Sequence, residues 1–240
     1  MLGKIQQNEL HDRLDSVRKR MELACSNSGR SSESVGLLAV SKRQPVGAIA
    51  ALNDLGQSDF GENRLQEALG KLAELRDRPI TWHFIGPVQS NKTRDIAAHF
   101  DWVQSVDRGK IIQRLDEQRP GELAPLNVCL QVNIDDEPQK AGARAEDLPA
   151  LADAVAACER LRLRGLMCIP AISEDPAKTR DSFERVARLA ESLRNAGHAL
   201  DTLSMGMSGD LELAIEAGST LVRVGTDLFG PRPGEENSAT

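Results

Sequence analysis

The sequence predicts one parallel α/β domain, a (β/α)8 barrel with an additional helix at its N-terminus. Eight short apolar runs alternate with longer amphipathic segments along the 240 residues. Parallel neighbouring strands need crossover connections, and eight such units suit a closed barrel of this length. An open doubly wound sheet is the alternative, but no G-x-G-x-x-G sequence follows the first run to support a dinucleotide-binding fold.

Most of the eight runs are apolar at consecutive positions, as expected of strands that are covered on both faces. We expect strands at Gly36–Ser41, Ser58–Gly61, Thr81–Gly86, Trp102–Val106, Asn127–Asn133, Leu163–Ile169, Thr202–Gly206 and Leu221–Gly225.

Helical periodicity marks several of the intervening segments, each with one apolar face. These faces comprise Leu65, Leu69 and Leu72; Leu148, Leu151 and Val155; and Phe183, Val186, Ala190 and Leu193. A first helix carrying Leu10, Leu14, Val17 and Met21 precedes the first strand and would cover the position of an eighth helix. The barrel would span residues 1–230, and the short polar tail 231–240 is expected to be disordered.

The composition excludes several classes of function. The 30 basic and 36 acidic residues give a net charge of −6, which argues against nucleic-acid binding. No apolar run reaches the roughly 18 residues of a membrane span, and the polar N-terminus predicts a cytoplasmic protein. Four widely spaced cysteines predict free thiols and no zinc site. The chain has no tyrosine, which excludes a phenolic acid or base.

Polar residues at the carboxyl ends of the strands are the candidates for chemistry, because barrel sites lie there. Lys42 directly follows the apolar run LLAVS. Partial burial lowers the pKa of a lysine and frees the neutral amine, which can form a Schiff base with a carbonyl. The alternative is a lysine that extends from the strand end to solvent.

Two further strand ends carry polar candidates. Asn63 could bind a ligand oxygen or cap the following helix. His83, between two aromatic residues, could stack on a flat ring or be a hydrogen-bonded core residue. Lys140, in the loop beyond Asn133, is most simply a solvated charge.

The last two strands end in hydroxyl-bearing and glycine residues, including Ser204, Ser208, Gly225 and Thr226. Their backbone N–H groups and hydroxyls could bind a phosphate, and the loops after strands seven and eight commonly do so in this fold. Helix capping and tight turns are the alternative explanation. Arg223 lies within the apolar strand LVRVG, so it requires either a carboxylate or a ligand acceptor.

An amine, a phosphate site and an inward arginine match the aldehyde, phosphate and ring nitrogen of pyridoxal 5′-phosphate (PLP). A cofactor-free aldolase that forms a Schiff base with a phosphorylated substrate would use the same groups. The residues alone leave both open.

The sequence also resembles a known family, the pyridoxal phosphate homeostasis proteins, also called the proline synthase co-transcribed or YggS-type family. The matching stretches are LLAVSK ending at Lys42, DFGENRLQE at 59–67, WHFIGPVQSNK at 82–92, QVNIDDEPQKAG at 131–142, LRGLMCI at 163–169, LSMGMSGDLELAI at 203–215 and LVRVGTDLFGPR at 221–232. They occur in family order over nearly the whole chain.

This resemblance implies a single barrel like the N-terminal domain of alanine racemases, holding PLP as a Schiff base on Lys42. It further implies that Arg223 faces the pyridine nitrogen and that Asn63 and His83 line the ring. The residues it implies around the phosphate are Ser204, Ser208, Gly225 and Thr226. Family members are described as carriers or regulators of vitamin B6 pools, so we expect a monomer that binds PLP and supplies PLP-dependent apoenzymes.

The resemblance and the residues together predict little or no catalytic turnover. An arginine donates to the ring nitrogen and disfavours its protonation, which weakens the ring as an electron sink. Without a tyrosine the chain also lacks the second base that a two-base racemase uses. The alternative is an enzyme with weak one-base racemase or transaminase activity through Lys42.

Overall fold

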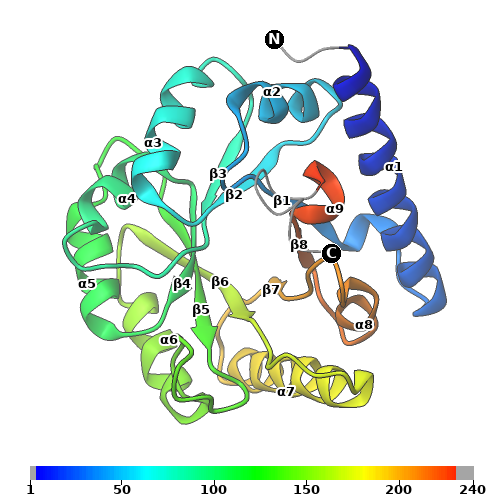
Figure 1. The fold of residues 1–240 in the computed structure, drawn as a ribbon. Coiled ribbons are helices and arrows are strands. Elements are labelled where there is room, and N and C mark those ends of the chain that lie inside the picture. The colour runs from blue at the N-terminus through cyan, green and yellow to red at the C-terminus, as the bar shows by residue number, and fades with distance from the viewer. Residues whose placement is uncertain (1–3, 231–240) are drawn as a thin grey trace.

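A computed structural model describes residues 4–230, which form a closed barrel of eight parallel strands surrounded by helices (Figure 1). The strands are β1 (Gly36–Val40), β2 (Asp59–Glu62), β3 (Thr81–Phe84), β4 (Trp102–Val106), β5 (Leu126–Val132), β6 (Leu161–Cys168), β7 (Thr202–Ser204) and β8 (Leu221–Val224). Each strand pairs with the next, and β1 also pairs with β8, which closes the sheet. The predicted barrel is confirmed, and all eight expected strands are present.

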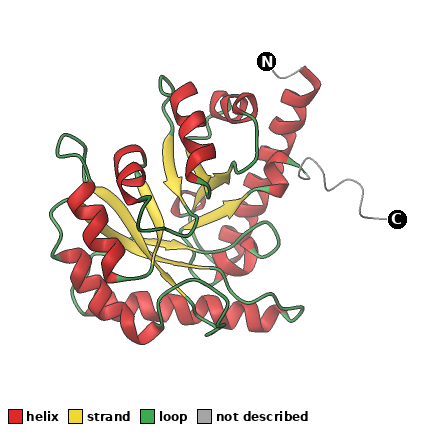
Figure 2. Cartoon of the chain, turned by 60° about the vertical axis from the view of Figure 1, so that its left-hand side comes forward, coloured by secondary structure: helices red, strands yellow, loops and turns green. Residues whose placement is uncertain are grey.

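A helix follows every strand. These helices are α2 (Val46–Asp54), α3 (Leu65–Glu74), α4 (Thr93–His99), α5 (Gly109–Gln118), α6 (Leu148–Ala156), α7 (Pro176–Asn195), α8 (Leu211–Glu216) and α9 (Thr226–Phe229). Figure 2 shows them on the outside of the strands. None of the helices within residues 4–230 combines the length and the apolar character needed to cross a bilayer.

The first helix, α1 (Lys4–Asn27), completes the outer layer. Its buried residues Leu10, Leu14, Val17 and Met21 recur at helical spacing and form one apolar face. This helix packs against α2, α8 and α9. Because α9 has only four residues, α1 covers the part of the barrel that a full helix after β8 would cover.

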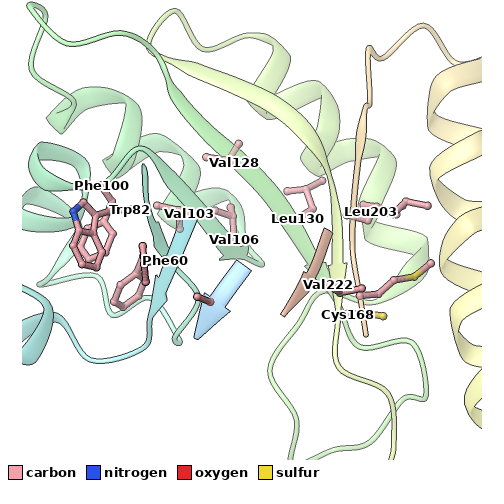
Figure 3. Close-up of a cluster of buried hydrophobic side chains, with 14 of the residues drawn as sticks. Phe60, Trp82, Phe100, Val103, Val106, Val128, Leu130, Cys168, Leu203 and Val222 are labelled. Atoms are coloured by element: carbon pink, nitrogen blue, oxygen red, sulfur yellow. The ribbon is translucent and has the colours of Figure 1, made fainter. Parts of the chain in front are cut away.

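The apolar core lies between the strands and the helices. Figure 3 shows Phe60, Trp82 and Phe100 gathered on one side of the sheet. The rings of Phe60 and Trp82 lie 6.0 Å apart between centroids, in a tilted arrangement. Such aromatic pairs bury large apolar areas and stabilise the packing on this side of the sheet.

The interior of the barrel is much more polar. His83, Gln104, Ser204 and Arg223 are all at most 4% exposed, and hydrogen bonds connect them. Buried polar groups require such partners, so the barrel interior is a specific polar assembly rather than a stack of aliphatic side chains.

The backbones of β6 and β7 approach closely at Gly165, which pairs with Thr202. A Cβ atom added at Gly165 would lie 1.7 Å from the carbonyl oxygen of Thr202. The two strands would have to separate to accommodate any side chain.

We therefore expect Gly165→Ala to lower the free energy of unfolding by about 2–3 kcal/mol, because overpacking forces the backbone to move. Gly70→Ala is the control, since a Cβ there has no neighbour within 4 Å. That change should raise stability by about 0.5–1 kcal/mol, as expected for glycine within a helix. Urea denaturation of both variants measures the difference, and equal stabilities would contradict it.

Candidate functional site

A cavity of about 490 Å³ opens at the carboxyl ends of the strands. Its lining comes from β1, β6 and β8 and from the segments that follow β1, β2, β3, β6, β7 and β8. The lining residues are Val40, Lys42, Gln44, Asn63, Ile85, Gly86, Pro87, Met167, Ile169, Met207, Ser208, Gly209, Arg223, Gly225, Thr226 and Gly230. This volume and this mixture of apolar walls with a few polar groups are typical of small-ligand sites.

The structure brings six of the eight predicted site residues together on this cavity. They are Lys42, Asn63, Ser208, Arg223, Gly225 and Thr226. The other two, His83 and Ser204, are buried and do not line the cavity, and each is held by neighbouring side chains.

A buried ion cluster holds the turn that carries Lys42. Lys71 of α3 donates from Nζ to the carbonyl oxygen of Ser41 at 2.8 Å and to Oε1 of Glu62 at 2.8 Å. The hydroxyl of Ser41 donates to the same Glu62 oxygen at 2.6 Å. The residue before Lys42 is thus fixed through both its backbone and its side chain.

The residue after Lys42 is held by the same cluster. Glu67 accepts from Lys71 at 2.6 Å and also from the backbone N–H of Arg43. Arg43 has a φ of 61°, in the left-handed region that side chains rarely adopt. Lys42 itself is half-buried and lines the cavity, and its backbone is fixed on both sides.

Arg223 is 4% exposed and lies at the inner wall of the cavity. Its Nη1 donates to the carbonyl oxygen of Ser204 at 2.5 Å and to the Ser204 hydroxyl at 2.9 Å, and its Nη2 donates to the carbonyl of Cys168 at 2.7 Å. Burial raises the pKa of the nearby Cys129 and Cys168 thiols to about 12. The guanidinium is therefore bound by neutral groups, although Asp210 contributes a longer-range attraction.

His83 stacks on Trp102, with ring centroids 5.1 Å apart and planes at 12°. Its Nε2 lies 3.0 Å from Oδ1 of Asp59, and its Nδ1 lies 2.8 Å from Nε2 of Gln104. The hydroxyl of Ser204 donates to Oε1 of Gln104 at 2.6 Å. These contacts use both ring nitrogens of His83 within the barrel interior.

Arg20 of α1 joins the two loops that were predicted to bind phosphate. Its guanidinium donates to the carbonyl oxygen of Ser208 at 2.8 Å and to Glu212 at 2.7 Å. It also forms an ion pair with Asp227 of α9 at 2.5 Å. The N-terminal helix therefore fixes the loop after β7 relative to the loop after β8.

A larger hollow of about 610 Å³ lies beside α7 and includes Asp135, Ser182 and Arg185. Asp135 accepts hydrogen bonds from Ser182 at 2.7 Å and from Arg185 at 3.3 Å, so these polar groups satisfy one another. Lys140 donates to the carbonyl oxygen of Pro170 at 2.8 Å and does not line either cavity. The smaller cavity is the better candidate because Lys42 and Arg223 both line it.

Sequence reasoning missed Lys71 and Arg20. Lys71 lies four residues after Glu67 in an amphipathic helix, a spacing that is typical of a solvated ion pair. Arg20 lies 188 residues from its Ser208 partner, so no local pattern indicated the contact.

The ion cluster generates a pH prediction. Burial raises the pKa of Glu62 above its ordinary value of 4.5, and this outweighs the hydrogen bonds from Lys71 and Ser41. The folded chain then binds this proton more tightly than the unfolded chain does. The contribution of Glu62 to stability is therefore fully present below about pH 4.5 and is lost as the pH rises through the raised value.

We expect the free energy of unfolding to fall more between about pH 5 and about pH 8 in the wild type than in Glu62→Gln, which cannot titrate there. Urea denaturation at both pH values measures the two differences. Equal pH dependence in the two proteins would contradict the assignment of a raised pKa to Glu62.

Comparison with known proteins places this site in a family. The model of the family "Alanine racemase, N-terminal domain" matches residues 13–233. The pyridoxal phosphate homeostasis protein of Pseudomonas aeruginosa is 57% identical over 221 residues, covering 92% of this chain and 95% of that protein. The Escherichia coli protein of the same name is 47% identical over 228 residues, covering 94% and 97%.

Solved structures agree with this relationship. PipY of Synechococcus elongatus, solved with PLP bound, superposes with a TM-score of 0.81 at 40% identity. The match covers 92% of this chain and 100% of PipY. The barrel, its cavity and these relatives together establish that the chain belongs to the pyridoxal phosphate homeostasis protein family, within the wider group that shares the alanine racemase N-terminal domain.

Proposed function

We propose that this chain binds pyridoxal 5′-phosphate in the 490 Å³ cavity, through a Schiff base with Lys42, and serves vitamin B6 homeostasis without catalytic turnover. One observation carries the proposal. Lys42, Arg223, Ser208 and Thr226, which carry an amine, a guanidinium and two hydroxyls, all line the same cavity.

The donor set fits the chemistry of this cofactor. Lys42 would bind the aldehyde and Arg223 would donate to the ring nitrogen, which is an acceptor when unprotonated. Ser208 and Thr226 would bind the phosphate together with the glycine-containing backbone of their loops. Gly225 allows the backbone to lie close to β1, because a Cβ there would be 3.3 Å from the carbonyl oxygen of Val40.

Relatives support the same ligand. The curated relatives carry the name pyridoxal phosphate homeostasis protein, and the PipY structure contains bound PLP. Their similarity extends over more than nine-tenths of this chain, and the family model matches residues 13–233, a range that includes every strand and loop that lines the cavity.

The surroundings of the ring favour a carrier or regulator over an enzyme. Bound PLP supplies an aldehyde for amines and a ring that withdraws electrons when its nitrogen is protonated. Arg223 is a permanent donor, so it would keep that nitrogen unprotonated. The chain has no tyrosine to serve as a second base. We further propose that it acts as a cytoplasmic monomer with PLP-dependent apoenzymes as recipients.

Substitution of Lys42 tests the covalent link. The purified wild type should show a visible absorption band after incubation with PLP, and borohydride should attach the cofactor to Lys42. Lys42→Met should lose both signals, while Lys110→Met, which changes an exposed lysine of α5, should retain them. A borohydride adduct on other lysines in the wild type, with Lys42 unmodified, would refute the proposal.

Amino-acid incubation tests the absence of turnover. The loaded protein, mixed with single L-amino acids, should produce no D-isomer and no oxo acid above the level given by Lys42→Met. Chiral chromatography with detection of oxo acids measures both products. Racemisation or transamination that depends on Lys42 would instead establish the protein as an enzyme.

A further inference from the structure

A continuous series of hydrogen bonds crosses the barrel interior below the cavity. It begins at Asp59, the first residue of β2, and passes through His83 of β3, Gln104 of β4 and Ser204 of β7 to Arg223 of β8. The four donor–acceptor distances in this order are 3.0, 2.8, 2.6 and 2.9 Å. We call these five residues the interior chain.

The two ends of the interior chain fix its direction. A guanidinium can only donate, so Arg223 donates to Ser204. Burial acts to raise the pKa of Asp59, but hydrogen bonds from His83 and Ser58 hold it below its ordinary value of 3.8. Asp59 is therefore a carboxylate at neutral pH and can only accept.

The three residues between these ends then have one consistent arrangement. Ser204 accepts from Arg223 and donates to the amide oxygen of Gln104, whose NH₂ group donates to Nδ1 of His83. Burial lowers the pKa of His83, so the ring is neutral and carries its proton on Nε2, facing Asp59. A reversed order would place two donors opposite each other at Arg223 and two acceptors opposite each other at Asp59.

The interior chain acts on the group that faces the cofactor. Arg223 uses three of its five N–H groups on Ser204 and Cys168 within residues 4–230, and both terminal nitrogens are engaged. The planar guanidinium therefore cannot turn without breaking these bonds. Its orientation depends on Ser204, and the Ser204 hydroxyl depends in turn on Gln104.

We propose that Gln104, His83 and Asp59 are positioning residues that hold Arg223 as a donor toward the ring nitrogen of PLP. This inference rests on the proposed function. It also extends the binding site to the opposite end of the barrel, since Asp59 lies at the amino end of β2 and its side chain is 35% exposed. A purely structural role would satisfy buried polar groups without changing how the ligand is bound.

The first test uses the protein without cofactor. Long-range ¹H–¹⁵N spectra of ¹⁵N-histidine-labelled protein resolve ring tautomers, and the chain has only four histidines to assign. In the wild type we expect His83 to be neutral with its proton on Nε2. In Ser204→Ala, Gln104 loses the hydrogen bond from Ser204 and is free to turn, so we expect a fraction of His83 to carry its proton on Nδ1 instead. A wild-type His83 protonated on Nδ1 would overturn the proposal.

The second test compares two buried glutamines in the loaded protein. Gln131 of β5 donates to the carbonyl oxygen of Ala141 at 2.9 Å and has no place in the interior chain. Gln104→Met should weaken PLP binding about tenfold, the loss expected for a broken buried hydrogen bond, and should shift the visible absorption maximum. Gln131→Met should leave affinity within about twofold and the maximum unchanged. Thermal melts check that both variants fold.

The third test acts at the far end of the interior chain, where a substitution leaves the cavity untouched. Asp59→Asn should shift the absorption maximum and weaken PLP binding. Asp201→Asn is the matched control, because Asp201 precedes β7 at the same end of the barrel and pairs with Arg164 instead. This pair also serves if Gln104→Met does not fold.

The outcomes separate the two proposals. If the wild type binds PLP and both Gln104→Met and Asp59→Asn bind and absorb as it does, the positioning role is overturned and the proposed function stands. If the wild type takes up no PLP, the proposed function fails, and with it the role toward the ring nitrogen. In that case the tautomer of His83 still decides whether the interior chain orients Arg223.

Discussion

The burial of one cation, Arg223, determines the character of the whole barrel. A guanidinium removed from water needs hydrogen-bond acceptors, and here they are the carbonyl oxygens of Ser204 and Cys168 and the Ser204 hydroxyl. Those acceptors require partners of their own, which brings Gln104 and His83 into the interior. The apolar packing that stabilises the fold therefore comes from the layer between strands and helices, where Phe60 and Trp82 lie.

The other groups on the cavity are held in a similar way, by charged side chains that lie behind them. Lys71 binds the turn next to Lys42, and Arg20 joins the loop of Ser208 to the helix that begins at Thr226. Each support comes from a different helix of the outer layer. The positions of these cavity-lining groups are thus set by the packing of α1 and α3 on the barrel, which makes the geometry of the cavity depend on the integrity of that layer.

The sequence predicted the fold and the strand-end residues well because both depend on local patterns. Lys42 and Arg223 stand out as charges at or within apolar strands, which is a strong signal. The depth of a side chain within the barrel is harder to predict. His83 and Ser204 lie near or at the carboxyl ends of β3 and β7 but do not line the cavity, because the register between neighbouring strands decides which layer they occupy. The contacts of Lys71 and Arg20 link distant segments and have no local signature.

The buried Arg223 accounts for both parts of the proposed function, the binding of the cofactor and the absence of turnover. A cofactor whose ring nitrogen meets a permanent cation gains a strong, directional hydrogen bond, which favours retention. The same cation opposes protonation of that nitrogen and so weakens the ring as an electron sink.

The neighbouring thiols Cys129 and Cys168, whose pKa values are about 12, stay neutral and cannot offset this effect. In the interior chain the compensating carboxylate, Asp59, is four hydrogen bonds away, where it can orient Arg223 without bonding to the ring. Tight binding and low reactivity are then consequences of one arrangement of charge.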